Sequence, residues 1–456
     1  MDEQSKGTPA ERRNGERVET KLLRIAEKAA KEPELKFVNL YYLMNEELLL
    51  DCYRRVRKNA AAGVDEMTKE EYGRNLAANL RDLVGRLHRM SYRPQAVRRT
   101  YVPKAGSDKL RPLGIPTLED KLVGMALARI LGAIYEQDFI ESSYGFRPAR
   151  SCHDALGALS HTVQEGNTNY IVEADIKKFF DSVDHDWMMK MLLHRVGDQR
   201  VLRLVKRFLI AGIVKDGERY KSDEGTPQGA SLSPILANIY LHYALDLWFE
   251  RVYRKKCKGK VRLIRYADDF VVCFQNREDA MEFKAELEQR LAKFALSLEP
   301  TKTKVLEFGP CAAKSAAARG EKPGTFDFLG FTHYNSKSAT GKRYRMKRVT
   351  ARKKYRAKLA EFKKWIKRAR TEPLPEIMRQ VAAKLRGHYS YYGVSDNSGR
   401  IGRFRQEVLD MLYKWLNRRS QKRSYNPEQF KAILYRFRLP KPRIVVNLHR
   451  PERMFI

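Results

Sequence analysis

The sequence predicts an α+β fold that is divided into more than one domain. Between about residues 97 and 310, short runs of β-forming residues alternate with helical segments, a pattern typical of a sheet backed by helices. From residue 342 onward the chain is predicted to be helical, and it is strongly basic. Because 456 residues exceed what one compact core usually organises, we expect two or three domains.

The N-terminal part is predicted to be helical after a loose start. Residues 1–35 are expected to form a flexible tail and the start of the first helix, because the opening stretch mixes both charges without a hydrophobic centre. Residues 36–96 form the next predicted unit. Its apolar residues at helical spacing are Leu40, Leu43, Met44 and Leu48. A glycine-containing loop over 59–68 ends at Thr68, a candidate N-cap, and a second helix is predicted over 76–90.

Residues 97–335 form the unit in which the sheet is predicted. The predicted strands are VRRTYVP (97–103), YIVEADI (170–176) and KVLEF (304–308), with RLIRYADDFVVCF (262–274) as a hairpin. The predicted helices are LVGMALARILGAIYEQ (122–137), 185–211 and 278–295. Residues 311–324 are predicted to be a surface loop.

The C-terminal quarter is predicted to be a basic helical domain over 342–420 followed by a basic segment over 421–456. Residues 342–456 hold 33 Lys and Arg against 8 Asp and Glu, so they supply +25 of the net charge of +35. A stripe suited to packing is formed by Tyr355, Leu359, Phe362 and Ile366. With further helices expected near 374–390 and 403–420, we predict a three-helix bundle with a basic outer face.

The charge and the cysteines narrow the class of protein. A net charge of +35 favours a polyanionic partner, and nucleic acid is the commonest one. The five cysteines form no CxxC pair and no Cys/His spacing, which argues against a zinc module and indicates a reducing compartment. No apolar run approaches the roughly 20 residues of a membrane span, so we expect a cytoplasmic protein without a membrane partner.

Three aspartates are the candidate catalytic residues. Asp268 and Asp269 lie at the turn of the predicted hairpin, and Asp175 ends a separate predicted strand. Carboxylates from separate strands are what two-metal phosphoryl transfer needs, and magnesium accepts carboxylates, waters and phosphates together. The alternative is an Asp-Asp turn without chemistry, because acids are common in turns.

Several segments, in this order, resemble the reverse transcriptases of bacterial group II introns, the intron maturases. The segments are NAAAGVDEMT (59–68), RRTYVPKAGSDKLRPLGIPTLEDKLV (98–123), FIESSYGFRPARSCHDAL (139–156), YIVEADIKKFFDSVDH (170–185), GTPQGASLSPILANIYLHYALD (225–246), RLIRYADDFVV (262–272), LSLEPTKTKV (296–305), FDFLGFTH (326–333) and KLRGHYSYYGV (384–394). The resemblance implies a right-hand polymerase: fingers, a palm with an antiparallel sheet, then an all-α thumb/maturase domain. No cysteine follows residue 311, so the HNH endonuclease domain of many such proteins is not expected.

The resemblance also implies roles for single residues. Asp175, Asp268 and Asp269, helped by the backbone carbonyl of Ile176, would hold two Mg²⁺ ions, with Mn²⁺ as an alternative. The residues implied to contact the incoming nucleotide are Lys104, Arg111, Phe180, Gln228 and Lys302. Phe180 would exclude a 2′-hydroxyl, Gln228 would brace nucleotide and template, and Lys302 would protonate the leaving pyrophosphate. Three alternatives remain open: Phe180 as a core residue, Lys302 as a solvated lysine, and Lys104 and Arg111 as part of a generic basic surface.

Two further sets of residues would contact nucleic acid. The primer grip would be Phe328, Leu329 and Gly330. The candidate RNA-binding residues are Arg386, His388, Tyr389, Tyr391 and Tyr392, because aromatic rings beside cations stack on unpaired bases. The tyrosines could equally pack between helices.

The implied function is an RNA-directed DNA polymerase of a group II intron, which makes cDNA and assists splicing and intron mobility. Its partners would be group II intron RNA, an RNA template with a DNA primer, target DNA and dNTPs, and it would associate with the nucleoid when bound to DNA. A homodimer is left open. The alternatives are an RNA-binding splicing factor with little polymerase role, and an intron-free reverse transcriptase that serves repair or phage defence.

Overall fold

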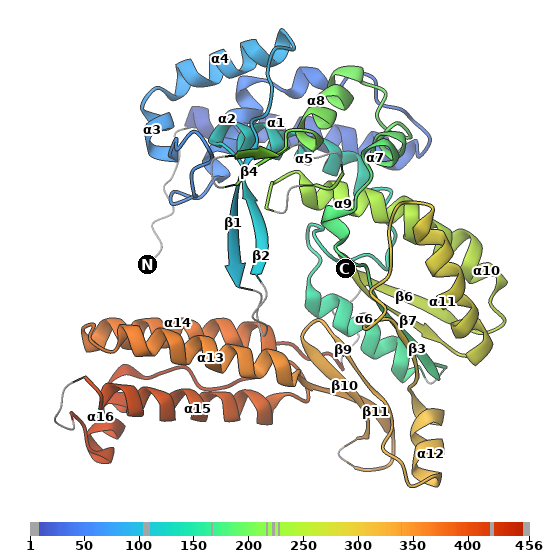
Figure 1. Cartoon of the computed structure of the whole chain (residues 1–456), viewed down its shortest axis with the longest axis vertical. Helices are drawn as coiled ribbons and strands as arrows, with labels where there is room; N and C mark the ends of the chain where they lie inside the picture. Colours follow the sequence, from blue (N-terminus) through green and yellow to red (C-terminus); the bar gives the residue numbers. More distant parts are fainter. Residues whose placement is uncertain are drawn as a thin grey trace.

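The computed structural model describes residues 9–103, 110–165, 167–215, 218–220, 224–226, 229–338, 340–419 and 424–449. Helices and three sheets form in these ranges, which confirms the predicted α+β class. Figure 1 shows a helical layer at the top, a sheet-containing part at the right and a helical bundle at the lower left. A β-hairpin projects from the helical layer toward the bundle (Figure 1).

The helical layer contains most of the N-terminal part of the chain. Its helices are α1 (Pro9–Lys31), α2 (Glu46–Arg55), α3 (Lys69–Arg74), α4 (Leu76–His88), α5 (Leu118–Tyr135) and α8 (Gln199–Leu209), with a 3-10 turn η1 at Tyr41–Leu43. Thr68 caps α3: its hydroxyl accepts from the Glu71 amide at 3.2 Å, and the Glu71 carboxylate accepts from the Thr68 amide at 2.9 Å. The predicted N-cap is confirmed.

The first helix, α1, lies within the segment predicted to hold a tail and the start of that helix, but it begins at Pro9, earlier than a long flexible tail would allow. Val18, Leu22 and Ala29 are buried, and α1 packs along α5. Val18, Leu22 and Ala29 recur at steps of four and seven residues, so they occupy one face of the helix, while charged residues cover other positions. A helix can therefore form here without the continuous hydrophobic centre whose absence suggested a tail.

Two predicted helices are interrupted, and side-chain caps explain both breaks. The side chain of Asn45 accepts a hydrogen bond from the Leu48 amide at 3.0 Å, so α2 starts after Asn45. The helical pattern predicted from Leu40 to Leu48 is therefore divided at this residue. Asp198 accepts from the Arg200 amide at 3.0 Å and starts α8, so the predicted helix 185–211 is two helices, α7 (His185–Leu192) and α8. The other oxygen of Asp198 accepts from the Leu40 amide at 2.8 Å, which ties the break to the N-terminal segment.

The projecting hairpin belongs to a four-stranded sheet of order β2-β1-β4-β5. Its strands are β1 (Val97–Pro103), β2 (Leu110–Ile115), β4 (Ile213–Lys215) and β5 (Glu218–Tyr220). β1 and β2 are antiparallel, with Val102 opposite Arg111. Only the first residues of β1 pair with β4, so the rest of the hairpin extends away from the helical layer.

The central sheet has the order β6-β7-β3-β8, and all neighbouring strands are antiparallel. Its strands are β3 (Tyr170–Asp175), β6 (Val261–Tyr266), β7 (Asp269–Phe274) and β8 (Lys304–Glu307). Val172 and Val272 point into one core, and Ile171 and Val271 into another. The alternation follows the two-residue period of a strand, so both faces of the sheet are covered.

Helices cover the two faces. The first core includes residues of α5, α7, α9 (Ser233–Leu241) and α11 (Arg277–Ala292), and the second includes α6 (Cys152–Gln164) and the C-terminal part of the chain. α9 continues through the π-helical turns η3 (His242–Asp246) and η4 (Phe249–Tyr253) into α10 (Arg254–Lys256). The strands predicted around the acids and over 170–176 and 304–308 are confirmed.

Two predicted segments after residue 310 are wrong. The predicted surface loop contains α12 (Pro310–Ala318), in which Ala312 and Ala316 are buried on one face. The helical pattern expected from 342 starts instead with a strand, β11 (Tyr344–Thr350), in a sheet of order β11-β10-β9 with β9 (Thr325–Phe328) and β10 (Phe331–Lys337). Met346, Arg348 and Thr350 alternate inward and are buried, a period of two that the many basic residues obscure.

The C-terminal bundle consists of α13 (Arg352–Ala369), α14 (Leu374–Tyr392) and α15 (Ser398–Leu416), with α16 (Pro427–Phe437) at its end. Tyr355, Phe362 and Ile366 are buried in it, and Leu359 packs against the same core. The predicted stripe and three-helix bundle are confirmed. The bundle shares its core with α6 and the central sheet, so the two parts are in direct contact.

Candidate active site

The three candidate aspartates lie together at one end of the central sheet. Asp175 is the last residue of β3 and Asp269 the first of β7, and the two are directly opposite across the antiparallel pair. Directly opposite residues have Cβ atoms about 4.5–5.5 Å apart. Asp268, the residue before Asp269, lies in the two-residue turn between β6 and β7. All three side chains are partly exposed, so solvent ions can reach them.

The turn that carries Asp268 needs a glycine beside it. Ala267 adopts a left-handed conformation with φ 57°, which lets the chain reverse within two residues. Gly145 packs against this turn, and a Cβ atom on Gly145 would lie 2.3 Å from the Ala267 nitrogen. Any other residue at 145 would therefore displace the turn.

A buried ion pair supports the turn from below. Arg265 and Asp246 both have side chains with 0% exposure, and two hydrogen bonds of 2.8 and 2.5 Å join them. Arg265 also donates to the Ala267 carbonyl at 3.0 Å and to the Asn238 side chain at 3.2 Å. Asn238 in turn donates to the Gly145 carbonyl at 2.8 Å. The network thus joins β6, α9 and η3 to the backbone of the turn at Ala267. It also reaches the backbone of Gly145, which packs against that turn.

Burial and neighbouring carboxylates raise the pKa values of two of the aspartates, Asp268 and Asp269. Burial, together with the charges of Asp175, Asp268 and Glu173, raises the pKa of Asp269 to about 7, against an opposing hydrogen bond from the Leu329 backbone. Burial and the charge of Asp175 also raise the pKa of Asp268, although Arg111 and Lys302 act in the other direction. A cation that bound all three groups would offset this repulsion.

Lys302 supplies one positive charge to the cluster. Its ammonium group forms an ion pair with the carboxylate of Asp175. Burial alone would lower the pKa of Lys302, but the hydrogen bond and the charge of Asp175 outweigh burial and raise it. Lys302 is therefore charged at neutral pH. It is paired with the carboxylate of Asp175, which a metal would also need as a ligand.

The donor set fits a divalent cation in chemistry, because three carboxylates are ligands that magnesium accepts. Within the described ranges, no three His, Cys, Asp or Glu side chains are already grouped closely enough to hold an ion. Asp175 is instead turned to Lys302. Binding of a cation by all three aspartates thus requires Asp175 to exchange its lysine partner. Ile176, whose carbonyl is the fourth implied ligand, is buried and bridges to Leu298 directly after the strand.

The described residues include only some of those predicted to contact the nucleotide. Lys104 and Gln228 lie outside the described residues. Arg111 lies on β2 with an exposed side chain, near enough for its charge to oppose the rise in the pKa of Asp268. Lys302 lies at the acids, as described above.

Phe180 and its neighbour Phe179 have different environments. Phe179 is buried with 2% exposure, whereas Phe180 is partly exposed, and their rings meet at 5.4 Å and 65°. The Phe180 carbonyl accepts from the Thr226 amide at 2.7 Å, and a Cβ on Gly225 would lie 2.9 Å from that carbonyl. Gly225, with φ 84°, thus allows the two backbone segments to approach closely.

The implied primer grip is a tight turn beside the acids. Phe328 is buried at the end of β9, and Leu329 and Gly330 have φ values of 48° and 79° before β10 begins. The Leu329 backbone reaches Asp269, and its carbonyl accepts from the Tyr391 hydroxyl at 2.9 Å. This turn therefore connects the acids to α14 of the bundle.

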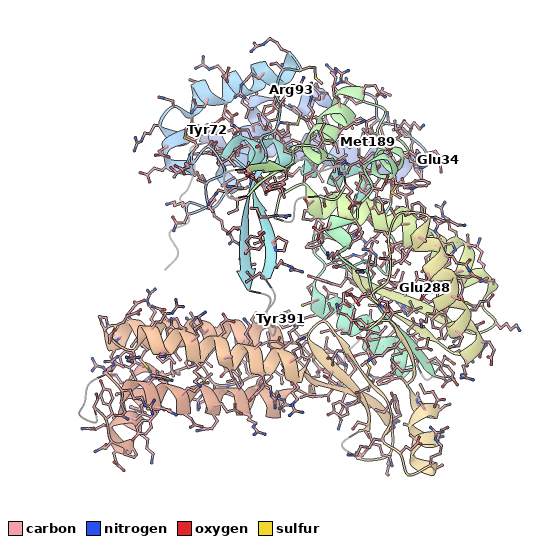
Figure 2. The ribbon with its side chains drawn as sticks, viewed as in Figure 1. Glu34, Tyr72, Arg93, Met189, Glu288 and Tyr391 are labelled. Carbon is pink, nitrogen blue, oxygen red and sulfur yellow. The ribbon has the colours of Figure 1, made fainter. Side chains whose placement is uncertain are left out.

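The predicted RNA-binding rings are mostly packed inside the bundle. His388, Tyr389 and Tyr392 are buried, and Tyr391 is partly buried between the bundle and the central sheet. Only Arg386 has an exposed side chain. The expectation that these rings are free to stack on bases from the surface is corrected, because helix packing takes most of their area. Figure 2 shows Tyr391 at the end of the bundle nearest the projecting hairpin.

Arg265, Asp246, Asn238 and Gly145 were not among the predicted site residues. Arg265 follows the buried Leu263 and Ile264 in β6 and is itself buried, whereas Arg262 in the same strand is partly exposed. An inward arginine needs a buried acid, which could have directed attention to Asp246 in the apolar segment before it. No local signal marks Gly145, because its close contact is with a turn more than 100 residues away.

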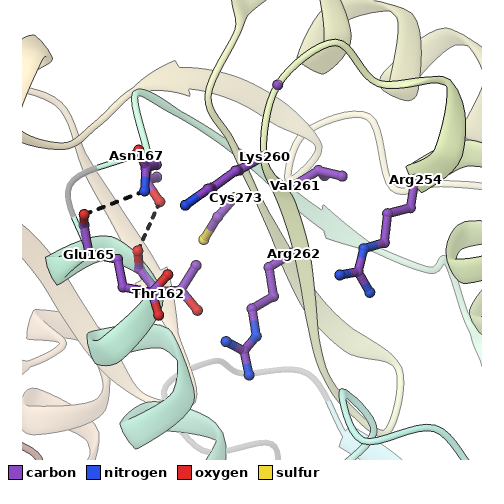
Figure 3. A pocket seen from close by; sticks show the side chains of 10 residues that line it. Thr162, Glu165, Asn167, Arg254, Lys260, Val261, Arg262 and Cys273 are labelled. Carbon is purple, nitrogen blue, oxygen red and sulfur yellow. Dashed lines mark hydrogen bonds between the residues drawn. The ribbon is translucent and has the colours of Figure 1, made fainter.

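A separate cavity of about 380 Å³ lies along the edge strand β6. Figure 3 shows Arg254, Lys260 and Arg262 around it, with Glu165 opposite. Cys273, which also lines it, is four residues from Asp269 on β7, or about 13 Å along the strand. This cavity is therefore not part of the acid cluster. Among the described helices, none has the length and apolar character that crossing a membrane requires.

Comparisons with known proteins agree with the motifs. The family described as reverse transcriptase (RNA-dependent DNA polymerase) matches residues 102–333, which include all three aspartates. The group II intron-encoded protein LtrA of Lactococcus lactis subsp. cremoris is 37% identical over 222 residues, which cover 48% of this chain and 37% of LtrA. Protein YkfC of Escherichia coli is 33% identical over 316 residues, 61% of this chain and 82% of YkfC. A 91 kDa protein in the cob intron of Schizosaccharomyces pombe is 31% identical over 322 residues, 59% of this chain and 39% of that protein. The match thus spans little more than a third of the length of LtrA.

Proposed function

This chain belongs to the reverse transcriptase (RNA-dependent DNA polymerase) family, and on that premise we propose that it copies RNA into DNA for a group II intron. One observation carries the proposal: Asp175 and Asp269 are directly opposite in the central sheet, and Asp268 lies in the adjoining turn. Acids from separate strands at one sheet end suit two-metal nucleotidyl transfer. The reaction is attack of a primer 3′-hydroxyl on the α-phosphate of a dNTP that pairs with an RNA template.

The reverse transcriptase family implies a right-hand polymerase, and we assign its parts as follows. The helical layer with the β1–β2 hairpin forms the fingers, and the central sheet with α6, α9 and α11 forms the palm. The bundle α13–α15 forms the thumb, which in a maturase also binds intron RNA. The charge of Arg111 acting on Asp268 supports a fingers hairpin that faces the palm.

Asp175, Asp268 and Asp269, with the carbonyl of Ile176, would hold two Mg²⁺ ions, or Mn²⁺ in their place. When bound, such ions lower the pKa of the attacking hydroxyl and stabilise the leaving pyrophosphate. Without them, burial and the neighbouring acids raise the pKa of Asp269 to about 7, so its carboxyl keeps a proton to a higher pH than an ordinary aspartate does. Because coordination needs ionised carboxylates, Asp269 loses this proton when the site is loaded.

The remaining residues position the nucleotide and the primer. Arg111 and Lys104 hold the triphosphate from the fingers, since two fixed cations match its charge. Lys302, charged and beside Asp175, moves to the leaving pyrophosphate and donates a proton to it. Gln228 braces the nucleotide and template.

Two further elements complete the site. Phe180 packs under the sugar, where its partly exposed ring excludes a 2′-hydroxyl. The turn at Leu329 and Gly330 holds the primer end, which is supported by its contacts with Asp269 and Tyr391.

The partner RNA is proposed from charge and from relatives. Residues 342–456 carry a net charge of +25, which favours a long polyanion. LtrA is named as encoded by a group II intron, and we propose that this chain likewise binds its intron RNA and assists splicing and mobility at a DNA target. Whether the flanking DNA folds into a group II ribozyme distinguishes this from an intron-free reverse transcriptase.

Primer extension on poly(rA)/oligo(dT) with Mg²⁺ at low salt tests the polymerase. We expect the wild type to extend, and Asp175→Asn and Asp269→Asn to lose at least about 100-fold in rate, as removal of a metal ligand does for a transition state that needs it. Asp186→Asn is the matched control, because Asp186 is an exposed acid on α7, away from the cluster. No incorporation by pure wild-type protein would overturn the proposal.

A further inference from the structure

The turn between β9 and β10 is held by hydrogen bonds from three sides. The Leu329 amide donates to the carboxylate of Asp269, and the Leu329 carbonyl accepts from the Tyr391 hydroxyl at 2.9 Å. The Gly330 carbonyl accepts from the amide of Ala351, the residue before α13, at 3.0 Å. The acid cluster and the first two helices of the bundle are therefore joined through the same two residues of the turn.

Both residues of this turn are in the left-handed region of backbone conformation. Gly330 adopts φ 79° at little cost, but Leu329 adopts φ 48°, which is uncommon for a residue with a bulky side chain. Such a conformation persists only where the surrounding contacts determine it. If one of the hydrogen bonds were lost, the turn would relax, and the Leu329 amide would move away from Asp269.

Tyr391 is fixed at its ring, at its hydroxyl and at its backbone. The ring is stacked on Phe331 of β10, with centroids 6.1 Å apart and planes at 12°. In the first turn of α6, His153 Nε2 is hydrogen-bonded to the Tyr391 carbonyl at 2.9 Å, and the Cys152 thiol is hydrogen-bonded to the Tyr391 hydroxyl. Tyr391 therefore joins α14, at the end of the bundle labelled in Figure 2, to α6 and to the turn.

We propose that Tyr391 is a positioning residue for the candidate active site: its hydroxyl holds the turn at Leu329 against Asp269, so that the seating of the bundle on the central sheet sets the orientation of this carboxylate. Tyr391 acts in this role through one peptide group, and it contacts neither primer nor nucleotide. Groups that orient a metal ligand from behind affect both metal affinity and activity. The inference rests on the proposed function, because it takes Asp269 as a metal ligand.

The alternative is that Tyr391 only packs, and its ring and its hydroxyl separate the two roles. Tyr391→Phe keeps the ring that stacks on Phe331 and removes the hydroxyl that binds the Leu329 carbonyl. If the ring were all that mattered, this variant would behave as the wild type does. If the hydroxyl positions the turn, the variant should fold normally and lose activity.

Tyr344→Phe is the matched control. The Tyr344 hydroxyl donates to the Asn335 side chain at 2.6 Å, is also partly buried, and joins β11 to β10 within the same small sheet. Tyr344 is opposite Lys337, six residues and about 20 Å along β10 from Phe331. Each variant thus loses one hydroxyl hydrogen bond of the same sheet, but only Tyr391→Phe loses one beside the acids.

Two measurements on the full-length protein test the role. In steady-state extension of poly(rA)/oligo(dT), we expect Tyr391→Phe to lower kcat about tenfold and to leave the KM for dTTP within about twofold, because the acids move and the nucleotide contacts do not. In electron paramagnetic resonance titration without nucleotide, we expect its Mn²⁺ affinity to fall about tenfold. Tyr344→Phe should match the wild type in both, and the two variants should have melting temperatures within about 2 °C of each other.

Two results would overturn the inference. The first is a kcat and a Mn²⁺ affinity of Tyr391→Phe that both lie within twofold of the wild type. The second is an equal loss in Tyr391→Phe and Tyr344→Phe, which would assign the effect to general loosening of the sheet. Failure of the wild type to extend the primer would overturn the proposed function, while the Mn²⁺ affinities of the two variants would still decide whether Tyr391 positions Asp269.

Discussion

The guanidinium of Arg265 donates a hydrogen bond of 3.0 Å to the carbonyl of Ala267, and so connects a fully buried ion pair to the turn that presents Asp268. All of this network lies beneath the solvent-facing acids. The position of the acids therefore depends on residues that touch neither substrate nor solvent.

Removal of one member of the buried pair should destabilise the protein strongly. Asp246→Ala leaves Arg265 charged and unpaired at 0% exposure, and breaking such a pair costs about 3–5 kcal/mol. Urea unfolding followed by circular dichroism measures the loss. Arg403→Met, which breaks the exposed pair with Glu407, is the control and should change stability by less than about 0.5 kcal/mol. A similar small change in both variants would contradict the assigned role.

Gly145→Ala should reduce polymerase activity more than stability. The added Cβ would lie 2.3 Å from the Ala267 nitrogen, so the turn with Asp268 must move. A displacement near 1 Å at reacting groups can lower a rate about 100-fold, and steady-state primer extension measures it. Gly132→Ala on α5 has free space at its Cβ and should keep full activity. Equal activity of the two variants would show that the turn tolerates the shift.

The metal-free protein should lose stability as the pH rises from about 4 to about 7. The folded-state pKa of Asp269, about 7, lies above its unfolded value near 3.9, so the folded protein binds the extra proton in this window. That contribution is fully present below the unfolded pKa and disappears as the pH passes the folded pKa. Asp269→Asn cannot titrate, so its melting temperature in EDTA should fall less over this range than that of the wild type. An equal fall in melting temperature between pH 4 and pH 7 for the two proteins would refute the raised pKa of Asp269.

Phe180 and Phe179 should separate sugar selection from folding. Phe180→Val opens the partly exposed position and should raise incorporation of ribonucleotides relative to deoxynucleotides at least tenfold, as judged by single-nucleotide kcat/KM values. Phe179→Ala removes a buried ring and should instead cost about 3–5 kcal/mol in unfolding free energy. Unchanged sugar selectivity in Phe180→Val would favour the core-residue alternative.

Local patterns predicted the sheet and the cluster of acids well. The strands around Asp268 and the strand ending at Asp175 are short apolar runs, and the short turn at Ala267 accounts for the pairing of β6 with β7. The pairing of β3 with β7 joins segments far apart in the chain and is not given by a local pattern. The cap at Thr68 was equally visible, because a capping box is contained in four residues.

Features that depend on distant partners were not predictable in this way. Asp198 ends one helix and starts another while it binds the amide of Leu40, 158 residues away. The local pattern predicts a helix where β11 forms, because the basic residues of this strand conceal the inward alternation of Met346 and Arg348. Arg265 and Asp246 are joined only after the strand packs on η3. In each case tertiary packing, rather than local propensity, decided the structure.

The ion pair between Lys302 and Asp175 has a consequence for the order of assembly. The ammonium group of Lys302 provides a positive charge beside Asp175 when no metal is bound. The chain can therefore fold without metal while one of the three acids is compensated. Binding of a divalent ion by Asp175 would then require Lys302 to leave this carboxylate, and an arriving triphosphate would give the displaced lysine a new anion. We expect Lys302→Met to bind Mn²⁺ more tightly than the wild type in the absence of nucleotide, by electron paramagnetic resonance titration. Equal or weaker affinity would show that the lysine does not restrain loading.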